Sequence, residues 1–260
     1  MVSSPRIRFE TAAGTDQGLK RSINQDAVYV WTSNPEFEPP RALLIVADGM
    51  GGHQEGGIAS QLAVDKLLEI LPDELESKKI NDNALELLMA QAVQGANEAI
   101  HNFAVDNKID PHDIGTTLEC VVVDGTYAYI VHIGDSRVYL LGKDGLKRIT
   151  KDHTAIAEMV DAGILDPEEI YTHPQRNILA QALGGNPLSE IEVSKFKLSI
   201  GERILVCSDG LWGMVRDPAL ERILLWASPP HILVDELIVA ANQAGGQDNI
   251  SVVVCDILPG

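Results

Sequence analysis

The segment Ala42–His53, with the sequence ALLIVADGMGGH, decides how the rest of the chain is interpreted. Its first six residues, Ala42–Ala47, are apolar or small, which is typical of a buried strand. Asp48 follows this run, and a glycine-rich turn leads to His53. A carboxylate that leaves a strand beside bare backbone suits Mg²⁺ or Mn²⁺, because both ions prefer oxygen ligands. Asp-Gly is also a common turn, so this segment needs matching carboxylates elsewhere before it indicates a metal site.

The composition favours a soluble globular protein. The chain has 260 residues, of which 45% are hydrophobic, and this is ample for a buried core. Its apolar runs fall short of the roughly 18 residues that a membrane span needs, and the N-terminal sequence MVSSPRIRF lacks the apolar core of a signal peptide. A net charge of −18 argues against nucleic-acid or anionic-membrane partners. The acidic excess also agrees with carboxylates gathered around bound metal.

The cysteines point to a reducing compartment. Cys120, Cys207 and Cys255 each lie inside an apolar, strand-like run. An odd number of cysteines in such positions indicates reduced, buried thiols and a cytoplasmic location. The sequence has neither a linker-like change of composition nor a repeat of fixed period, so we expect one domain over residues 1–260.

The local patterns predict both helices and strands. Helices are predicted at Gly57–Leu71, with Pro72 after the end, from Asn81 or Asp82 to about Ala104, near Ala155–Ala162, near Pro218–Trp226 and at Pro230–Ala244. Strands are predicted at Arg6–Ala12, Ala27–Trp31, Arg203–Cys207 and Ile250–Ile257. Asp124-Gly125 and Asp144-Gly145 predict two hairpins, and we expect residues 117–149 to form one antiparallel meander.

These elements predict an α+β fold in which two antiparallel sheets pack face to face with helices outside. Several aspartates then share the position of Asp48. Asp135 and Asp209 follow apolar runs, Asp248 precedes the last strand, and Asp26 lies at the mouth of an early strand. Each one alone could be a turn or a cap, but paired sheets bring strand ends to one rim. Clustered carboxylates raise each other's pKa unless cations are present, so the cluster predicts bound metal.

Other catalytic schemes lack their motifs. The sequence has no phosphate-binding Gly-x-x-x-x-Gly-Lys loop, no Gly-x-Gly-x-x-Gly and no His-Glu-x-x-His, and its cysteines lack zinc spacing. Cys207 is better explained as a buried thiol than as a nucleophile. Ser136 and Ser208 adjoin carboxylates, but neither lies in a Gly-x-Ser-x-Gly turn.

Seven segments resemble, in order, the motifs of the metal-dependent protein phosphatase 2C family in its compact bacterial form. They are Arg21–Asp26, Val46–His53, Gly115–Thr117, His132–Arg137, Thr150–His153, Cys207–Trp212 and Gly245–Asn249. The likeness extends over roughly Ile7 to Ile257. It implies a central β-sandwich of two antiparallel sheets flanked by pairs of helices (four layers, αββα) with metals at one rim, in agreement with the local patterns.

The resemblance also implies a set of metal ligands. Asp48 would bridge two Mg²⁺ or Mn²⁺ ions, with the carbonyl of Gly49 completing the second site. Asp209 and Asp248 would hold the first ion. Two cations about 3.5–4 Å apart can lower the pKa of a shared water and stabilise in-line displacement at phosphorus.

Four further residues receive roles from the same resemblance. Asp26 would act through metal-bound waters, and Asp135 would support a third, weaker ion. Arg21 would grip two phosphate oxygens with its guanidinium fork. His53 is the candidate general acid for the leaving oxygen. Some family members carry this histidine directly after Asp-Gly, so a loop histidine with a binding role alone is the alternative.

Outside the metal rim, two groups are interpreted by likeness. The segment 152–190, which we call the flap segment, resembles the flap that lies beside the metal rim in the family. It carries Met159, Ile164, Tyr171 and Arg176, and we expect it to be mobile and to help select substrates. Six residues are interpreted as support: Thr116, Thr117, His132, Ser136, His153 and Asn249.

The sequence as a whole predicts a cytoplasmic, monomeric protein serine/threonine phosphatase. A metal-bridging water would hydrolyse phosphoserine or phosphothreonine in protein substrates directly, without a phosphoenzyme. Nucleic-acid and membrane partners are not expected. Two alternatives stay open: a catalytically silent module that binds phosphorylated partners, and an enzyme that acts on small phosphate esters.

Overall fold

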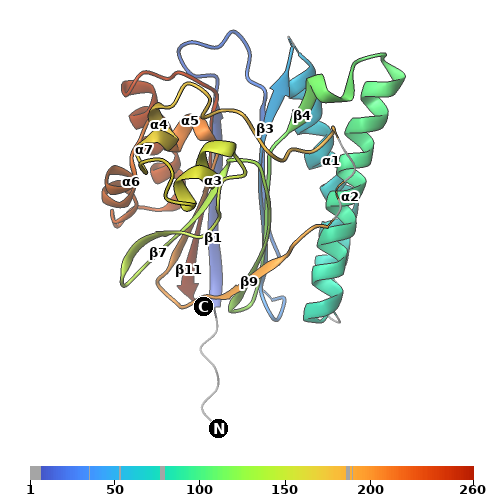
Figure 1. The fold of residues 1–260 in the computed structure, drawn as a ribbon. Helices are drawn as coiled ribbons and strands as arrows, with labels where there is room; N and C mark the ends of the chain where they lie inside the picture. The colour runs from blue at the N-terminus through green and yellow to red at the C-terminus, as the bar shows by residue number, and fades with distance from the viewer. Residues whose placement is uncertain (1–6, 35, 53, 77–79, 186–187, 189) are drawn as a thin grey trace.

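The computed structural model describes residues 7–34, 36–52, 54–76, 80–185, 188 and 190–260. His53 lies outside the described residues, so its predicted role stays a prediction. In the described part, two antiparallel sheets pack face to face between layers of helices (Figure 1). The predicted α+β sandwich is confirmed.

Each sheet combines strands from distant parts of the chain. The first sheet has the order β1 (Ile7–Asp16), β11 (Ile250–Pro259), β10 (Arg203–Cys207), β7 (Arg137–Gly142) and β8 (Gly145–Arg148). The second has the order β2 (Asp26–Thr32), β3 (Arg41–Gly51), β5 (Leu118–Asp124), β6 (Tyr127–Ile133) and β9 (Ser194–Lys197), and β4 (Ile114–Thr116) pairs with β3. Chain neighbours β1 and β2 therefore belong to different sheets.

Strand β3 is apolar from Ala42 to Ala47 because both of its faces are buried there. Leu44 and Val46 point into the core between the sheets, whereas Leu43 and Ile45 pack beneath the helices on the outer face. Side chains alternate between the two faces of a strand, so a fully covered strand needs apolar residues at every position. This explains the run that precedes Asp48.

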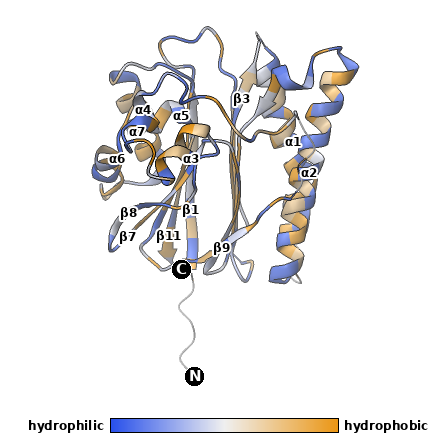
Figure 2. Cartoon of the chain, viewed as in Figure 1, coloured by the Kyte–Doolittle hydropathy of each residue, from blue (hydrophilic) through white to orange (hydrophobic). Residues whose placement is uncertain are grey.

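Helices cover the outer faces of both sheets. Against the second sheet lie α1 (Glu55–Leu75) and α2 (Asp82–Asp106), and on the side of the first sheet lie α5 (Asp209–Trp212), α6 (Asp217–Leu224) and α7 (Pro230–Gln243). The flap segment contains α3 (Ala155–Asp161) and α4 (Glu169–Thr172). Figure 2 shows hydrophilic and hydrophobic residues alternating along the helices, as expected for helices with one face exposed to solvent and one face packed on a sheet.

The predicted end of α1 before Pro72 is wrong. The helix continues through Pro72 to Leu75. Proline has no N–H and costs the helix a hydrogen bond at this point. The last turn persists because Leu71 and Leu75 are fully buried in the core under the second sheet, and packing of an apolar face outweighs local propensity.

The predicted meander over residues 117–149 is also wrong, although both hairpins are confirmed. The pair β5–β6 belongs to the second sheet and the pair β7–β8 to the first. The chain crosses between the sheets through Gly134–Ser136. Gly134 has φ of 104°, and a Cβ there would lie 2.6 Å from the side chain of Thr117, so the crossing requires glycine. Hairpin signals are local, whereas the sheet that a hairpin joins is decided by packing.

Several short elements had no clear sequence signal: β4, β9, α4, α5 and the 3-10 turn Pro111–Asp113. The three cysteines are buried with free thiols, as predicted. Across the ranges that the structure describes, none of the helices combines the length and the apolar character needed to cross a membrane.

Candidate active site

A cavity of about 210 Å³ collects most of the predicted site residues. Its lining comprises Arg21, Gln25, Asp48, Gly49, Met50, Gly51, Thr117, Asp135, Asn177, Leu179, Asp209, Asp248 and Asn249. Asp26 does not line it but lies directly across from Asp48 in the register of β2 and β3. The structure thus brings together the predicted residues that it describes.

Asp48 is held by its backbone. Its N–H donates to Thr117 Oγ1 at 3.0 Å, and its carbonyl accepts from Thr116 Oγ1 and from the N–H of Thr117, both at 2.9 Å. The next residue, Gly49, packs directly on the start of α1, where a Cβ would lie 2.1 Å from the carbonyl oxygen of Gly56. A side chain at position 49 would therefore push α1 away from the cavity.

Asp209 and Asp135 are tied together through α5. Asp209 is the first residue of this helix, and Trp212 is its last. The indole Nε1 of Trp212 donates to the carbonyl of Asp135 at 2.9 Å. Its ring also lies 3.4 Å from the guanidinium carbon of Arg137, the buried arginine that donates two hydrogen bonds to Asp152. Trp212 therefore joins α5 to the sheet crossing.

Asn249 holds the loop that carries Arg21. Its side-chain oxygen accepts from the N–H of Gln25, and its side-chain nitrogen donates to the carbonyls of Gln17 and Ile23. Arg21 then reaches Asp248, with Nη2 at 2.6 Å from Oδ2. The arginine side chain stays 51% exposed, so other N–H groups of its fork are open to a ligand.

Burial and the charges of neighbouring aspartates raise the pKa values of Asp48 and Asp209. Burial raises the pKa of Asp48 well above its ordinary value, and the charges of Asp26 and Asp209 raise it further. Burial likewise raises the pKa of Asp209, with Asp135 and Asp248 as the next causes. In the absence of a cation, these groups resist ionisation.

The two outer carboxylates shift in the same direction. Burial raises the pKa of Asp26 to about 6, although hydrogen bonds from Ser251 and Ser208 oppose the change. Burial raises the pKa of Asp135 to about 7, with Asp152 adding to the shift and Arg137 opposing it. A carboxylate whose pKa is raised must lose its proton before it can bind a metal ion.

The donor set fits a hard divalent cation. Asp26 Oδ1 and Asp209 Oδ1 are buried without a hydrogen-bond partner among the described residues. Leaving such oxygens unpaired is costly, and a cation would satisfy them. Among those residues, however, three His, Cys, Asp or Glu side chains are nowhere gathered closely enough to hold an ion. Backbone carbonyls and waters would complete the coordination, as is usual for Mg²⁺.

The support residues hold the ends of the sheet crossing. His132 Nδ1 forms a short contact with the buried Glu119, and its Nε2 contacts the carbonyl of Lys151. His153 Nδ1 accepts from the N–H of Gly134 at 3.2 Å. Neither histidine lines the cavity.

Sequence reasoning missed three lining residues. Gln25 lies inside the segment Arg21–Asp26, but its neutral side chain did not indicate a role in the site. Asn177 and Leu179 come from the flap segment, where neither periodicity nor spacing singled them out. The resemblance predicted a flap beside the metal rim, but it did not single out these two residues, which lie outside the helices of the flap segment.

Comparison with known proteins identifies the family to which the chain is similar. A family model described as protein phosphatase 2C matches residues 13–231. The serine/threonine phosphatase Stp of Listeria innocua is 33% identical over 242 residues, which is 93% of each chain. The serine/threonine protein phosphatase PstP of Mycobacterium tuberculosis is 38% identical over 95% of this chain, which spans 45% of the length of PstP.

Solved structures agree. The serine/threonine phosphatase of S. agalactiae superposes with a TM-score of 0.85 at 32% identity, covering 96% of this chain and 99% of that one. The catalytic domain of PstP, solved in complex with two manganese ions, gives 0.82 at 34% identity, covering 97% of this chain and 99% of that one. These solved structures therefore share the fold of the chain over nearly its whole length. The chain belongs to the protein phosphatase 2C family.

Proposed function

We propose that this chain is a Mg²⁺- or Mn²⁺-dependent protein serine/threonine phosphatase that acts on phosphorylated proteins. The observation that carries the proposal is a group of four aspartates around one cavity, with Arg21 at its edge. Asp135 is buried, and Asp48, Asp209 and Asp248 are half-buried. The names of relatives such as Stp and PstP support the same reaction. We further propose a cytoplasmic monomer without nucleic-acid or membrane partners.

The cavity residues would share the work of holding metal. Asp48 and the carbonyl of Gly49 would contact two ions, and Asp209 and Asp248 would complete the first site. When bound, the two ions would lower the pKa of a shared water, and hydrolysis would then proceed by direct attack on phosphorus without a phosphoenzyme. The two manganese ions in the structure of the PstP catalytic domain support a two-ion site.

The remaining two carboxylates would have weaker roles. Asp26 would act through water, and Asp135 would support a third, weaker ion. Their raised pKa values mean that each must lose a proton before it contributes a full negative charge. Occupation of the third site is therefore expected to increase with pH.

Arg21 would bind the substrate phosphate. One of its nitrogens is engaged by Asp248, and the exposed remainder of the fork can donate to phosphate oxygens. A lysine at this position would keep the charge but lose the paired donors. His53 would protonate the leaving oxygen, with a role in binding alone as the alternative.

We also propose that the flap segment contributes to substrate choice. Asn177 and Leu179 line the active-site cavity, and residues 179–183 line an adjoining hollow of about 380 Å³ together with Met50 and His112. The flap segment is thus placed to touch whatever enters the cavity. Deleting or rigidifying it should change the preference among phosphopeptides, and an unchanged preference would refute this role.

Phosphate release from a phosphothreonine peptide tests the main proposal. We expect release to require Mn²⁺ or Mg²⁺ and to be lost in Asp48→Ala and in Asp209→Asn, because each removes a metal carboxylate. Asp235→Asn, which removes an exposed carboxylate from α7, should keep full activity. Activity that persists in excess chelator would sink the proposal.

The same assay separates the two alternatives. A silent binding module would retain the peptide without releasing phosphate under any metal condition. An enzyme for small esters would turn over a metabolite phosphate faster than a phosphoprotein. We expect the phosphoprotein to be the better substrate.

A further inference from the structure

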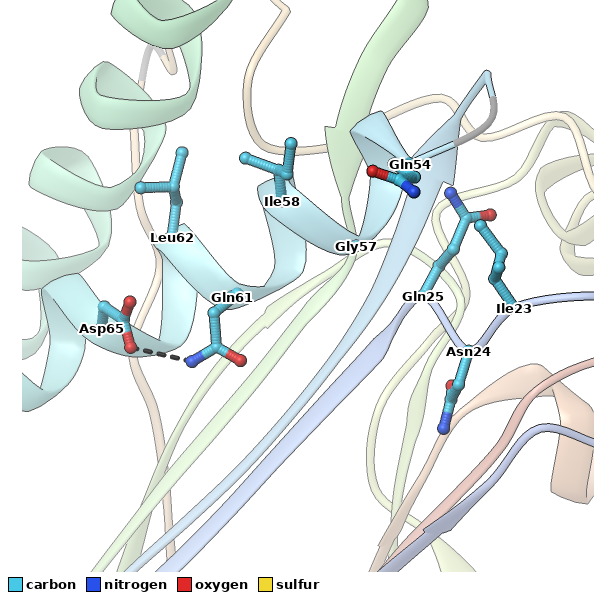
Figure 3. A pocket seen from close by; sticks show the side chains of 9 residues that line it. All are labelled: Ile23, Asn24, Gln25, Gln54, Gly57, Ile58, Gln61, Leu62 and Asp65. Carbon is cyan, nitrogen blue, oxygen red and sulfur yellow. Dashed lines mark hydrogen bonds between the residues drawn. The ribbon is translucent and has the colours of Figure 1, made fainter.

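A second hollow adjoins the active-site cavity along helix α1. It has a volume of about 530 Å³ and lies between α1 and the segment 23–25 that leads into β2 (Figure 3). It is lined by the N-cap residue of α1, Gln54, and by five residues of the helix: Gly57, Ile58, Gln61, Leu62 and Asp65. Residues spaced by three, four, seven and eleven positions share one face of a helix. We call this hollow the α1 groove.

The α1 groove is continuous with the cavity. Gln25 lines both of them, and Gly49 of the cavity packs against Gly56 in the first turn of α1. Figure 3 shows the side chain of Gln25 extending toward Gln54 at that end of the helix. A polypeptide that leaves the cavity past Gln25 would therefore enter the groove at Gln54 and leave it at Asp65.

The lining of the groove suits an extended peptide. Ile58 and Leu62 are half-buried and project from the same side of α1, which gives an apolar surface. Amide side chains such as Gln54 can pair with the N–H and C=O groups of a peptide backbone. At the far end, Asp65 is exposed and accepts a hydrogen bond from Gln61 at 2.8 Å. Asp65 is the charged residue among the described residues that line the groove.

We propose that the α1 groove binds the part of a protein substrate that flanks the phosphorylated residue, with an apolar side chain on Ile58 and Leu62 and an arginine or lysine at Asp65. This inference rests on the proposed function. The groove from Gln54 to Asp65 is about 16 Å long at about 1.5 Å per helical residue, which matches roughly five residues of extended peptide. Because the phosphothreonine lies in the cavity, before the groove begins at Gln54, the basic residue is expected at least about five positions from it. The net charge of −18 favours the same class of peptide.

Phosphothreonine peptides that carry arginine or glutamate about five to eight positions before or after the phosphothreonine test the proposal. In wild-type protein with Mn²⁺, we expect kcat/KM to favour arginine over glutamate on one side by about three- to tenfold, the range for reversal of a partly exposed charge pair. Asp65→Lys should abolish or reverse this preference. Asp73→Lys makes the same charge reversal at an exposed position of α1 outside the groove and should retain it.

Two further measurements keep the test decisive. Fluorescence anisotropy of a labelled peptide in chelator reports binding without turnover, and Asp65→Lys should weaken the arginine peptide about three- to tenfold relative to Asp73→Lys. Hydrolysis of p-nitrophenyl phosphate, which is too small to reach the groove, should be equal in wild type and Asp65→Lys.

The outcomes separate this inference from the proposed function. Metal-dependent phosphate release with the same peptide preference in wild type and Asp65→Lys would overturn the groove and leave the phosphatase standing. Peptide binding that depends on Asp65, without phosphate release from any peptide, would uphold the groove and remove the proposed reaction.

Discussion

Asp26 and Asp48 face each other across the antiparallel pair formed by β2 and β3. Residues in this relation have Cβ atoms about 4.5–5.5 Å apart, so two carboxylates oppose each other's ionisation. Burial is the first cause of the raised pKa of both, and the charge of Asp26 is the second cause for Asp48. The pair is therefore a source of instability until a cation separates the charges.

Replacing Asp26 with asparagine should stabilise the metal-free protein. The substitution removes one buried carboxylate but keeps an oxygen that can accept the hydrogen bond from Ser208 Oγ. Relief of about 1 kcal/mol would raise the melting temperature in chelator by about 2–4 °C. A lower melting temperature for Asp26→Asn, with Asp235→Asn unchanged, would contradict the repulsion argument.

Metal binding should stabilise the protein through the same carboxylates. At a metal concentration about 100 times Kd, binding adds about 2.7 kcal/mol, which corresponds to a rise of roughly 5–10 °C in melting temperature. We expect this rise for wild type with Mn²⁺ and little of it for Asp48→Ala. Differential scanning calorimetry with and without chelator measures it, and equal rises in both proteins would place the metal elsewhere.

Trp212→Phe should destabilise the fold through the sheet crossing. The change removes the hydrogen bond to the carbonyl of Asp135 and part of the surface that covers Arg137. We expect a loss of about 1–3 kcal/mol in the free energy of unfolding, measured in urea. Trp226→Phe is the matched control, because Trp226 is 46% exposed. Equal losses in the two variants would disprove a special role for Trp212.

Arg41→Met should be among the most destabilising single changes in the chain. Arg41 is 1% exposed, donates to Asp124 at 2.8 Å and donates to the carbonyl of Leu75 at 2.6 Å, where α1 ends. Its loss would leave the Asp124 carboxylate and the Leu75 carbonyl without these hydrogen bonds, and would lower the free energy of unfolding by about 3–5 kcal/mol. The double variant with Asp124→Asn should recover part of this cost; if it recovers none, the ion pair is not the cause.

Stability should depend on pH through His153. Burial, followed by the nearby His132, lowers the pKa of His153 to about 4. The folded protein keeps this imidazole neutral, whereas the unfolded chain takes up a proton below its ordinary pKa of about 6.5. The stabilisation is therefore complete above about pH 6.5 and is lost as the pH falls toward 4.

The variant His153→Asn isolates this contribution. Because asparagine does not titrate, the excess stability of wild type over the variant should shrink between about pH 7 and pH 4.5. Protonation of Nδ1 would also end its acceptance of the Gly134 N–H. Urea unfolding at both pH values measures the difference, and a constant difference would refute the assignment.

The fold class was predictable because its signals are local and repeated. The apolar run before Asp48, the Asp-Gly hairpins and the periodic face of α2 each report an element, and their order restricts the architecture. What could not be predicted depends on distant partners. The turn of α1 beyond Pro72 persists because Leu75 is buried, and β7 joins the first sheet because of packing on that side.

Those residues of the candidate site that carry a charge were predictable from the sequence. Strand-end aspartates such as Asp48 and Asp209 carried a pattern, and the structure places them around one cavity. Gln25 and Leu179 carried none, because a neutral side chain in a loop gives no signal of what it approaches. The burial of Arg41 and Arg137 was also not predicted. The acceptors Asp124 and Asp152 are distant in the sequence, so no local pattern indicates these ion pairs.

The pairing of β1 with β11 has a consequence for how the chain is made. These strands are joined along their length, from Ile7 opposite Pro259 to Asp16 opposite Ile250, and they lie side by side in Figure 1. During synthesis on a ribosome, β1 emerges first and its sheet partner last. Until β11 is available, the edge of β1 that it covers stays unpaired, and an unpaired strand edge can pair with strands of other chains. Folding of this sheet is thus a late event that closes a loop of more than 230 residues, and truncated chains should aggregate rather than fold.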